Sequence, residues 1–177
     1  FRHVDAGHLG IGQFELQVRR VHARSIRALP ARRHHPRMSD GMNHVWIDTH
    51  CHLDAAEFDA DRAAVHARAR AAGVGLLVLP AVCGANLDAV RTLAHAGGDA
   101  YALGYHPLYV EQEPADALPR LAAALQAAAG DARLAAVGEI GLDGFVAGLD
   151  PQVQARWCAD RLGLAREARL PVVLHVR

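Results

Sequence analysis

The chain has 177 residues, of which 51% are hydrophobic, and its 19 basic and 19 acidic side chains give a formal net charge of zero. This length and apolar content suit one globular domain with a sizeable core. No apolar run approaches the roughly 20 residues of a membrane-spanning helix, so we expect no membrane partner.

The charge is unevenly distributed along the chain. Residues 1–44 contain eight Arg against three acidic residues, whereas residues 45–177 contain 11 Arg against 16 acidic residues. The longer segment therefore lacks the broadly basic surface that attracts nucleic acid in many binding proteins. Residues 1–44 begin with Phe1 and show no sustained hydrophobic periodicity. We expect this segment to be a disordered or non-native extension, and we expect residues 45–177 to form the folded unit.

From Val45 onward the apolar pattern is regular and predicts strands that alternate with helices. The predicted strands are 45–49, 74–79, 101–105, 134–140 and 172–175. The predicted helices are 59–72, 86–96, 116–129 and a fourth that starts at Asp150-Pro151. The apolar stripe of this fourth helix consists of Val153, Trp157, Leu164 and Ala168. In an α/β chain this alternation predicts a parallel sheet with right-handed crossovers. A complete eight-unit barrel takes about 250 residues. We therefore expect 45–177 to be the first half, about five β/α units, of a TIM-like (β/α)8 barrel that is truncated at its C-terminus.

The first predicted strand runs into Asp48-Thr-His-Cys-His-Leu-Asp54, which places two histidines two residues apart. If the strand continued through them, His50 and His52 would face the same way and their imidazoles could converge on one cation. Asp48 would lie on the same side and could orient a ligand or join the site. Cys51 would point the other way, and we expect it to pack against apolar neighbours.

Two later strands also end in groups that can bind metal. Glu139 ends the run that starts at Leu134, and His175 and Arg177 end the run that starts at Pro171. A buried carboxylate is costly unless it is paired or bound to a metal. Since the carboxyl ends of parallel strands open onto one face, we expect His50, His52, Glu139 and His175 to converge within about 8 Å, a span that one or two ions can bridge.

Four ordered motifs resemble the TatD family of metal-dependent hydrolases: Asp48-Thr-His-Cys-His-Leu-Asp54, Gly104-Tyr-His-Pro107, Val137-Gly-Glu-Ile-Gly-Leu-Asp143 and Pro171-Val-Val-Leu-His-Val-Arg177. The resemblance covers residues 45–177. It implies a distorted TIM barrel that holds two divalent metals, and an enzyme that cleaves DNA, often as a 3′–5′ exonuclease. RNA is a possible second substrate, and the oligomeric state stays open.

The resemblance also implies a role for individual residues. His50 and His52 would bind the first metal, Glu139 would be shared by both metals and essential for catalysis, and His175 would bind the second. His106 and Arg177 would lie near the substrate phosphate. Mixed His and carboxylate ligation suits Zn, Mn, Ni or Co better than Mg. The family also uses a later His and a later Asp, so we expect residues 1–177 alone to be inactive and poorly folded.

Two other readings remain open. The protein could be a related barrel hydrolase that cleaves an ester or amide bond, such as that of a D-aminoacyl-tRNA, because one fold serves several chemistries. Alternatively, the Arg-rich segment 1–44 could bind nucleic acid without any enzymatic activity. The three cysteines are odd in number and form no Cys-x-x-Cys pair, which favours a reducing, cytoplasmic compartment.

Overall fold

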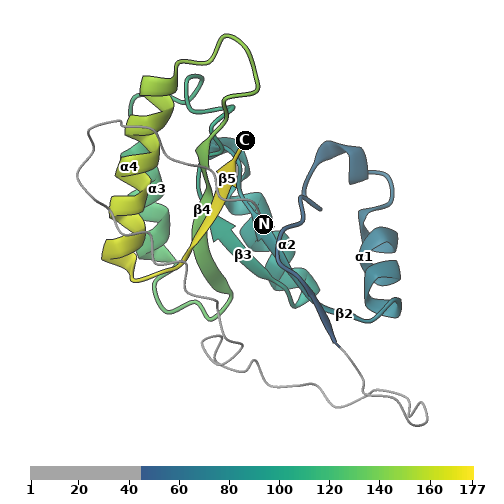
Figure 1. The fold of residues 1–177 in the computed structure, drawn as a ribbon. Coiled ribbons are helices and arrows are strands. Elements are labelled where there is room, and N and C mark those ends of the chain that lie inside the picture. The colour runs from purple at the N-terminus through teal and green to yellow at the C-terminus, as the bar shows by residue number, and fades with distance from the viewer. Residues whose placement is uncertain (1–44) are drawn as a thin grey trace. The chain divides into compact units, whose positions relative to one another are not determined.

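The computed structural model describes residues 45–177 (Figure 1). The predicted extension 1–44 lies outside the described residues. Among residues 45–177, no helix is both long enough and apolar enough to cross a membrane.

The described chain contains five strands, four α-helices and two short 3-10 helices, in nearly the order that the sequence predicts. The strands are β1 (Trp46–Asp48), β2 (Val74–Pro80), β3 (Ala100–Leu103), β4 (Leu134–Leu142) and β5 (Val172–Val176). The α-helices are α1 (Arg62–Ala71), α2 (Leu87–Gly97), α3 (Ala117–Ala127) and α4 (Pro151–Ala168), and the 3-10 helices are η1 (Ala56–Phe58) and η2 (Gly84–Asn86). The main departures are that α1, α3, β1 and β3 are shorter than predicted, while β4 extends two residues further.

All neighbouring strands pair in parallel, in the order β1-β2-β3-β4-β5. Figure 1 shows the sheet curling, with the helices on its outer side. Helix α1 contacts β2, α2 contacts β2 and β3, α3 contacts β3, and α4 contacts β4. This is the curled half of a (β/α)8 barrel, as predicted, and it brings the carboxyl ends of the strands to one rim.

The local sequence explains how the helices form and which side they bury. In α2 the buried residues Leu87, Val90 and Ala94 recur at helical spacing, and the helix ends at Gly98 with a φ of 74°. Helix α4 begins with a capping residue, since Asp150 accepts hydrogen bonds from the backbone N–H groups of Gln152 and Val153, and Pro151 occupies the first turn.

The buried face of α4 differs from its predicted apolar stripe. Val153, Trp157 and Leu164 pack against the core as predicted, and the Trp157 ring meets Tyr105 edge to face with ring centroids 5.8 Å apart. Ala168 is exposed, however, so this part of the prediction is wrong. The most deeply buried side chains of the helix include the polar residue Gln154, which is 2% exposed. Hydrophobic periodicity does not detect it because its burial depends on hydrogen bonds to the loop after β4.

At the amino end of the strands, Asp131 links three elements. Its Oδ2 lies 2.8 Å from His95 Nε2 and accepts a 2.8 Å hydrogen bond from the Tyr101 hydroxyl, while its Oδ1 accepts from the backbone N–H of Arg133. Burial acts to raise the pKa of this carboxyl, but these hydrogen bonds outweigh burial and lower the pKa to about 2.

We therefore expect Asp131→Asn to lower the free energy of unfolding by about 1–2 kcal/mol at pH 7, after allowance for the exposure of His95. A carboxyl whose pKa is lowered in the folded state stabilises that state above its unfolded pKa of about 4, and this stabilisation disappears as the pH falls through about 2. Urea denaturation at pH 7, 4 and 2 tests this. A variant that loses the same stability as the wild type between pH 4 and 2 would contradict it.

Candidate metal centre

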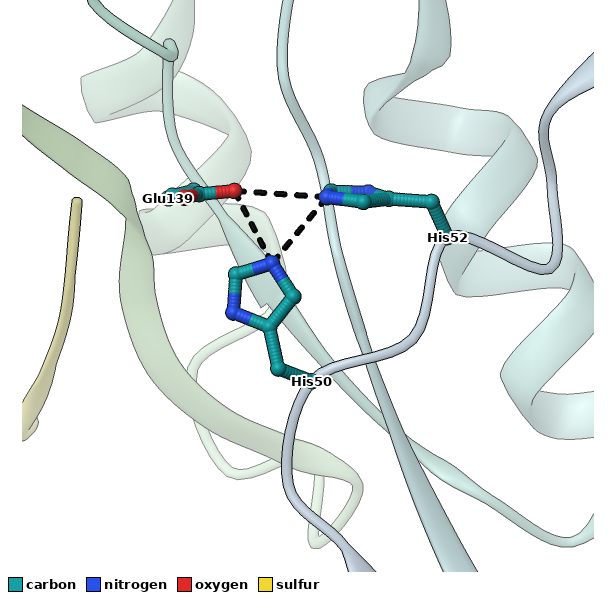
Figure 2. A group of neighbouring side chains, drawn as sticks. All are labelled: His50, His52 and Glu139. Carbon is teal, nitrogen blue, oxygen red and sulfur yellow. Dashed lines mark hydrogen bonds and ion pairs between the residues drawn. The ribbon is translucent and has the colours of Figure 1, made fainter. Parts of the chain in front are cut away.

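His50 and His52 lie in the loop after β1, because the strand ends at Asp48. The predicted strand alternation is therefore not what makes them converge. The loop is held by two hydrogen bonds, in which the His50 N–H donates to Asp48 Oδ1 (3.1 Å) and the Cys51 N–H donates to the Val78 carbonyl (3.1 Å). Asp48 thus orients the backbone of this loop. The two imidazoles still converge, with their Nε2 atoms 3.0 Å apart (Figure 2).

Glu139 reaches this histidine pair from the neighbouring part of the curled sheet. It lies in β4, is 4% exposed, and points its carboxylate at both rings in Figure 2. Its Oε2 lies 3.0 Å from His50 Nε2 and 3.3 Å from His52 Nε2. The same oxygen is buried and has no well-directed hydrogen bond to any group in residues 45–177. An unsatisfied buried oxygen that faces two ring nitrogens matches the ligand set of a cation.

A second group shares the other oxygen of Glu139. Glu139 Oε1 lies 3.0 Å from His175 Nδ1 and 3.5 Å from His106 Nε2, and these two ring nitrogens are 2.9 Å apart. In each group of three, the possible ligand atoms lie within 4.8 Å of one another. The predicted convergence of the four strand-end residues is therefore confirmed in geometry. His106, predicted to lie near the substrate, is buried within the second group.

Two glycines allow β4 to approach β5 on either side of Glu139. Gly138 has a φ of 153°, and a Cβ there would lie 2.7 Å from the Cβ of Val173. Gly141 has a φ of 145°, and a Cβ there would lie 1.9 Å from the carbonyl oxygen of its partner His175. A side chain at either position would separate the strands. The glycines thus help to place Glu139 beside His175.

The electrostatics of the cluster favour a charged Glu139 carboxylate beside a neutral His106 ring. Burial acts to raise the pKa of Glu139, but the neighbouring histidine rings, His52 foremost, lower it to about 2. Burial lowers the pKa of His106 to about 4, so this ring is neutral at pH 7. The nearby Glu139 carboxylate raises the pKa of His52 against the opposing effect of burial. A proton on His52 would compete with a cation for the ring nitrogen that faces Glu139.

Sequence reasoning missed Asp143 as part of the site. This residue follows β4, is 4% exposed, and has its Oδ2 2.9 Å from His175 Nε2. The available signal was its place at the end of the Gly-Glu-Ile-Gly-Leu-Asp run that contains Glu139. Its contact with His175 depends on the pairing of β4 with β5, which the local sequence does not show.

Two other predicted residues lie outside the ligand groups. The guanidinium carbon of Arg177 lies 3.9 Å from the centroid of the exposed Phe145 ring, in a cation–π arrangement. The substrate role of Arg177 stays a prediction. Cys51 packs against the hydrophobic core, and burial raises the pKa of its thiol, as suits the packing role predicted for it.

The sequence of this chain is similar to those of known proteins in one family. The sequence profile of the TatD related DNase family matches residues 47–177. The metal-dependent hydrolase YjjV of Escherichia coli K12 is 43% identical over 135 residues, which are 75% of this chain and 51% of YjjV. The 3′-5′ ssDNA/RNA exonuclease TatD of Klebsiella pneumoniae 342 is 34% identical over 132 residues, which are 74% of this chain and 49% of that relative. The chain thus spans about half the length of the curated relatives it matches.

Solved structures agree with the fold. The crystal structure of Escherichia coli YjjV aligns with a TM-score of 0.71 at 39% identity, over 77% of this chain and 52% of YjjV. A TatD family hydrolase from Entamoeba histolytica aligns with a TM-score of 0.66 at 19% identity, over 75% and 50% of the two chains, and supports the fold alone. From the profile match and the paired His and Glu groups at the strand ends, the chain belongs to the TatD related DNase family of metal-dependent hydrolases.

Proposed function

We propose that the protein is a metal-dependent nuclease that hydrolyses phosphodiester bonds of single-stranded DNA or RNA from the 3′ end. The observation that carries the proposal is the carboxylate of Glu139, whose two oxygens face two separate groups of imidazole nitrogens. Phosphodiester hydrolysis commonly uses two metals about 3.5–4 Å apart, and a bridging carboxylate suits that spacing.

In this proposal His50, His52 and Glu139 hold one divalent cation, and Glu139 and His175 hold the other. His106, whose Nδ1 accepts the Leu108 N–H, keeps the place near the substrate phosphate that was predicted for it. The metals, when bound, would supply an activated water and neutralise the charge that develops on phosphorus. The chain's own residues prepare the site. The low pKa of Glu139 keeps its carboxylate charged at neutral pH, and the low pKa of His106 keeps that ring neutral beside it. Mixed nitrogen and oxygen ligation favours Zn, Mn, Ni or Co over Mg.

The substrate class comes from the relatives, because the local charge does not identify it. Several relatives at 32–35% identity carry the name 3′-5′ ssDNA/RNA exonuclease TatD. Residues 45–177 carry more acidic than basic side chains, so substrate phosphates would be attracted by the metals and by single residues such as Arg177. Exposed Phe145 beside Arg177 offers a surface on which a base could stack.

Because the chain spans about half of each relative, the test compares two proteins. One is residues 1–177, and the other is the same chain followed by the remaining half of Escherichia coli YjjV. Both are incubated with Mn²⁺ and 3′- or 5′-labelled single-stranded oligonucleotides, and with a D-aminoacyl-tRNA. We expect the completed protein to shorten the DNA from its 3′ end and residues 1–177 alone to show little hydrolysis.

The products distinguish the alternatives. Deacylation of the D-aminoacyl-tRNA without cleavage of DNA or RNA would replace the nuclease proposal with an ester hydrolase. Hydrolysis that continues at the same rate in excess EDTA would overturn the metal centre itself. We also propose that residues 45–177 form the hydrolase unit. Deletion of residues 1–44 should therefore leave the hydrolysis rate of the completed protein unchanged.

A further inference from the structure

Asp143 uses its two carboxylate oxygens for different partners. Its Oδ2 lies 2.9 Å from His175 Nε2. Its Oδ1 accepts hydrogen bonds from the backbone N–H groups of Phe145 (2.8 Å) and Val146 (3.1 Å), which belong to the loop after β4. One side chain therefore connects a ring of the candidate metal centre with the loop that carries the exposed aromatic residue.

The backbone of Asp143 is itself held from α4. The Asp143 N–H donates to Gln154 Oε1 (2.7 Å), and Gln154 Nε2 donates to the Asp143 carbonyl (3.1 Å). Both residues are buried, with exposed fractions of 4% and 2%. This pair of hydrogen bonds holds the backbone that carries the carboxylate, and it accounts for the burial of a glutamine in α4.

The contacts of His175 constrain which ring nitrogen carries a proton. Nε2 faces Asp143, whose ionised carboxylate can only accept a hydrogen bond. Nδ1 faces Glu139 Oε1 at 3.0 Å and His106 Nε2 at 2.9 Å. A proton on Nε2 satisfies Asp143 and leaves the Nδ1 lone pair directed at the second ligand group, which is the arrangement by which a carboxylate orients a metal-binding histidine.

We propose that Asp143 is a positioning residue for the second metal site. It selects the His175 tautomer that presents Nδ1 to the cation, and it fixes the 143–146 loop, with Phe145, relative to that site. This inference rests on the proposed two-metal centre and deepens it, because it names the group through which the loop and the metal are connected.

Asp143→Asn tests this directly, because the two backbone N–H groups dictate the orientation of the new amide. The amide oxygen must stay on the side of Phe145 and Val146, so the amide nitrogen faces His175 Nε2. That nitrogen donates a hydrogen bond, so Nε2 must become the acceptor and the proton moves to Nδ1, the proposed ligand atom. The variant keeps the loop hydrogen bonds and the side-chain volume, so folding is preserved.

The experiment titrates Zn²⁺ by calorimetry into the completed protein, which carries the remaining half of Escherichia coli YjjV, and records long-range ¹H–¹⁵N spectra of the histidine rings in its zinc-loaded form. We expect the wild type to bind two Zn²⁺, with His175 protonated at Nε2. In Asp143→Asn, one Zn²⁺ should bind about 10–100-fold more weakly while the other changes less than about threefold. The control is Asp131→Asn, which alters another His–Asp pair at the opposite end of the strands and should leave both affinities unchanged.

Each outcome has one meaning. If Asp143→Asn bound Zn²⁺ at both sites with wild-type affinity and kept the His175 proton on Nε2, the positioning role would be overturned and the metal centre would stand. Absence of Zn²⁺ binding by the wild type would overturn the metal centre, and this inference with it. A second variant, Gln154→Leu, removes the clamp on the Asp143 backbone and should weaken the same single site; an unchanged affinity there would contradict the proposed support from α4.

Discussion

Replacement of Glu139 by Gln is expected to weaken the binding of both metals together. The substitution keeps the side-chain volume but removes the negative charge. It also replaces one carboxylate oxygen by an amide nitrogen, and each of the two oxygens faces one pair of histidines: His50 and His52, or His106 and His175. We expect metal affinity to fall about 100-fold or more, since even residues that only orient ligands change affinity by 10–100-fold. Hydrolysis by the completed protein should fall at least about 10³-fold.

Calorimetry with Zn²⁺ or Mn²⁺ measures the first effect, and single-turnover hydrolysis of a labelled oligonucleotide measures the second. Cys51→Ala is the matched control, because Cys51 lies between His50 and His52 in the chain but packs against the core. It should retain metal binding and rate within about threefold. If Glu139→Gln hydrolysed DNA at the wild-type rate in excess metal, the shared-carboxylate role would be wrong.

Replacement of Asp99 by Ala is expected to cause a large loss of stability at the opposite end of the strands. Asp99 is 1% exposed and precedes β3. Its Oδ1 accepts a hydrogen bond from the Leu77 N–H (2.9 Å) and pairs with Arg70, and its Oδ2 lies 2.7 Å from His66 Nε2. The carboxylate thereby ties α1 to β2 and to the start of β3. Its removal leaves a buried N–H and two basic side chains without their acceptor.

We expect Asp99→Ala to lower the free energy of unfolding by about 3 kcal/mol, and Asp99→Asn by about 2 kcal/mol because one oxygen remains. Urea denaturation followed by circular dichroism measures both changes. Glu167→Gln provides the control, since Glu167 is exposed on α4 and forms no ion pair within residues 45–177. Its stability should stay within about 0.5 kcal/mol of the wild type. Equal stability of Asp99→Ala and Glu167→Gln would contradict the proposed role of the cluster.

The order and type of the elements could be predicted from the sequence because their signals are local. Helix α2 buries Leu87, Val90 and Ala94 at helical spacing, and β2 is nearly continuous in apolar residues. The same locality explains why the strand-end residues could be named in advance. In a parallel sheet, the end of every strand reaches one rim, so His50, His52, Glu139 and His175 could be grouped without knowing any distance between them.

The arrangement within the centre was decided by tertiary structure. His50 and His52 converge through a loop that is hydrogen-bonded to β2, and not through strand alternation, because β1 ends at Asp48. The division of the Glu139 oxygens between two histidine groups depends on the curl of the sheet. That curl brings residue 139 against residues 50 and 52, nearly 90 positions earlier in the chain.

The contacts of Asp143 and Gln154 were also decided by tertiary structure. The sequence by itself determined a half-barrel of parallel strands with side chains capable of binding metal at their carboxyl ends, because patterns of period 2 and 3.6 and strand-end residues are properties of short segments. Only the folded chain showed that Asp143 contacts His175 and that Gln154 of α4 holds Asp143. These contacts depend on strand register and helix rotation, which arise from packing between segments distant in sequence and leave no periodic pattern within any one of them.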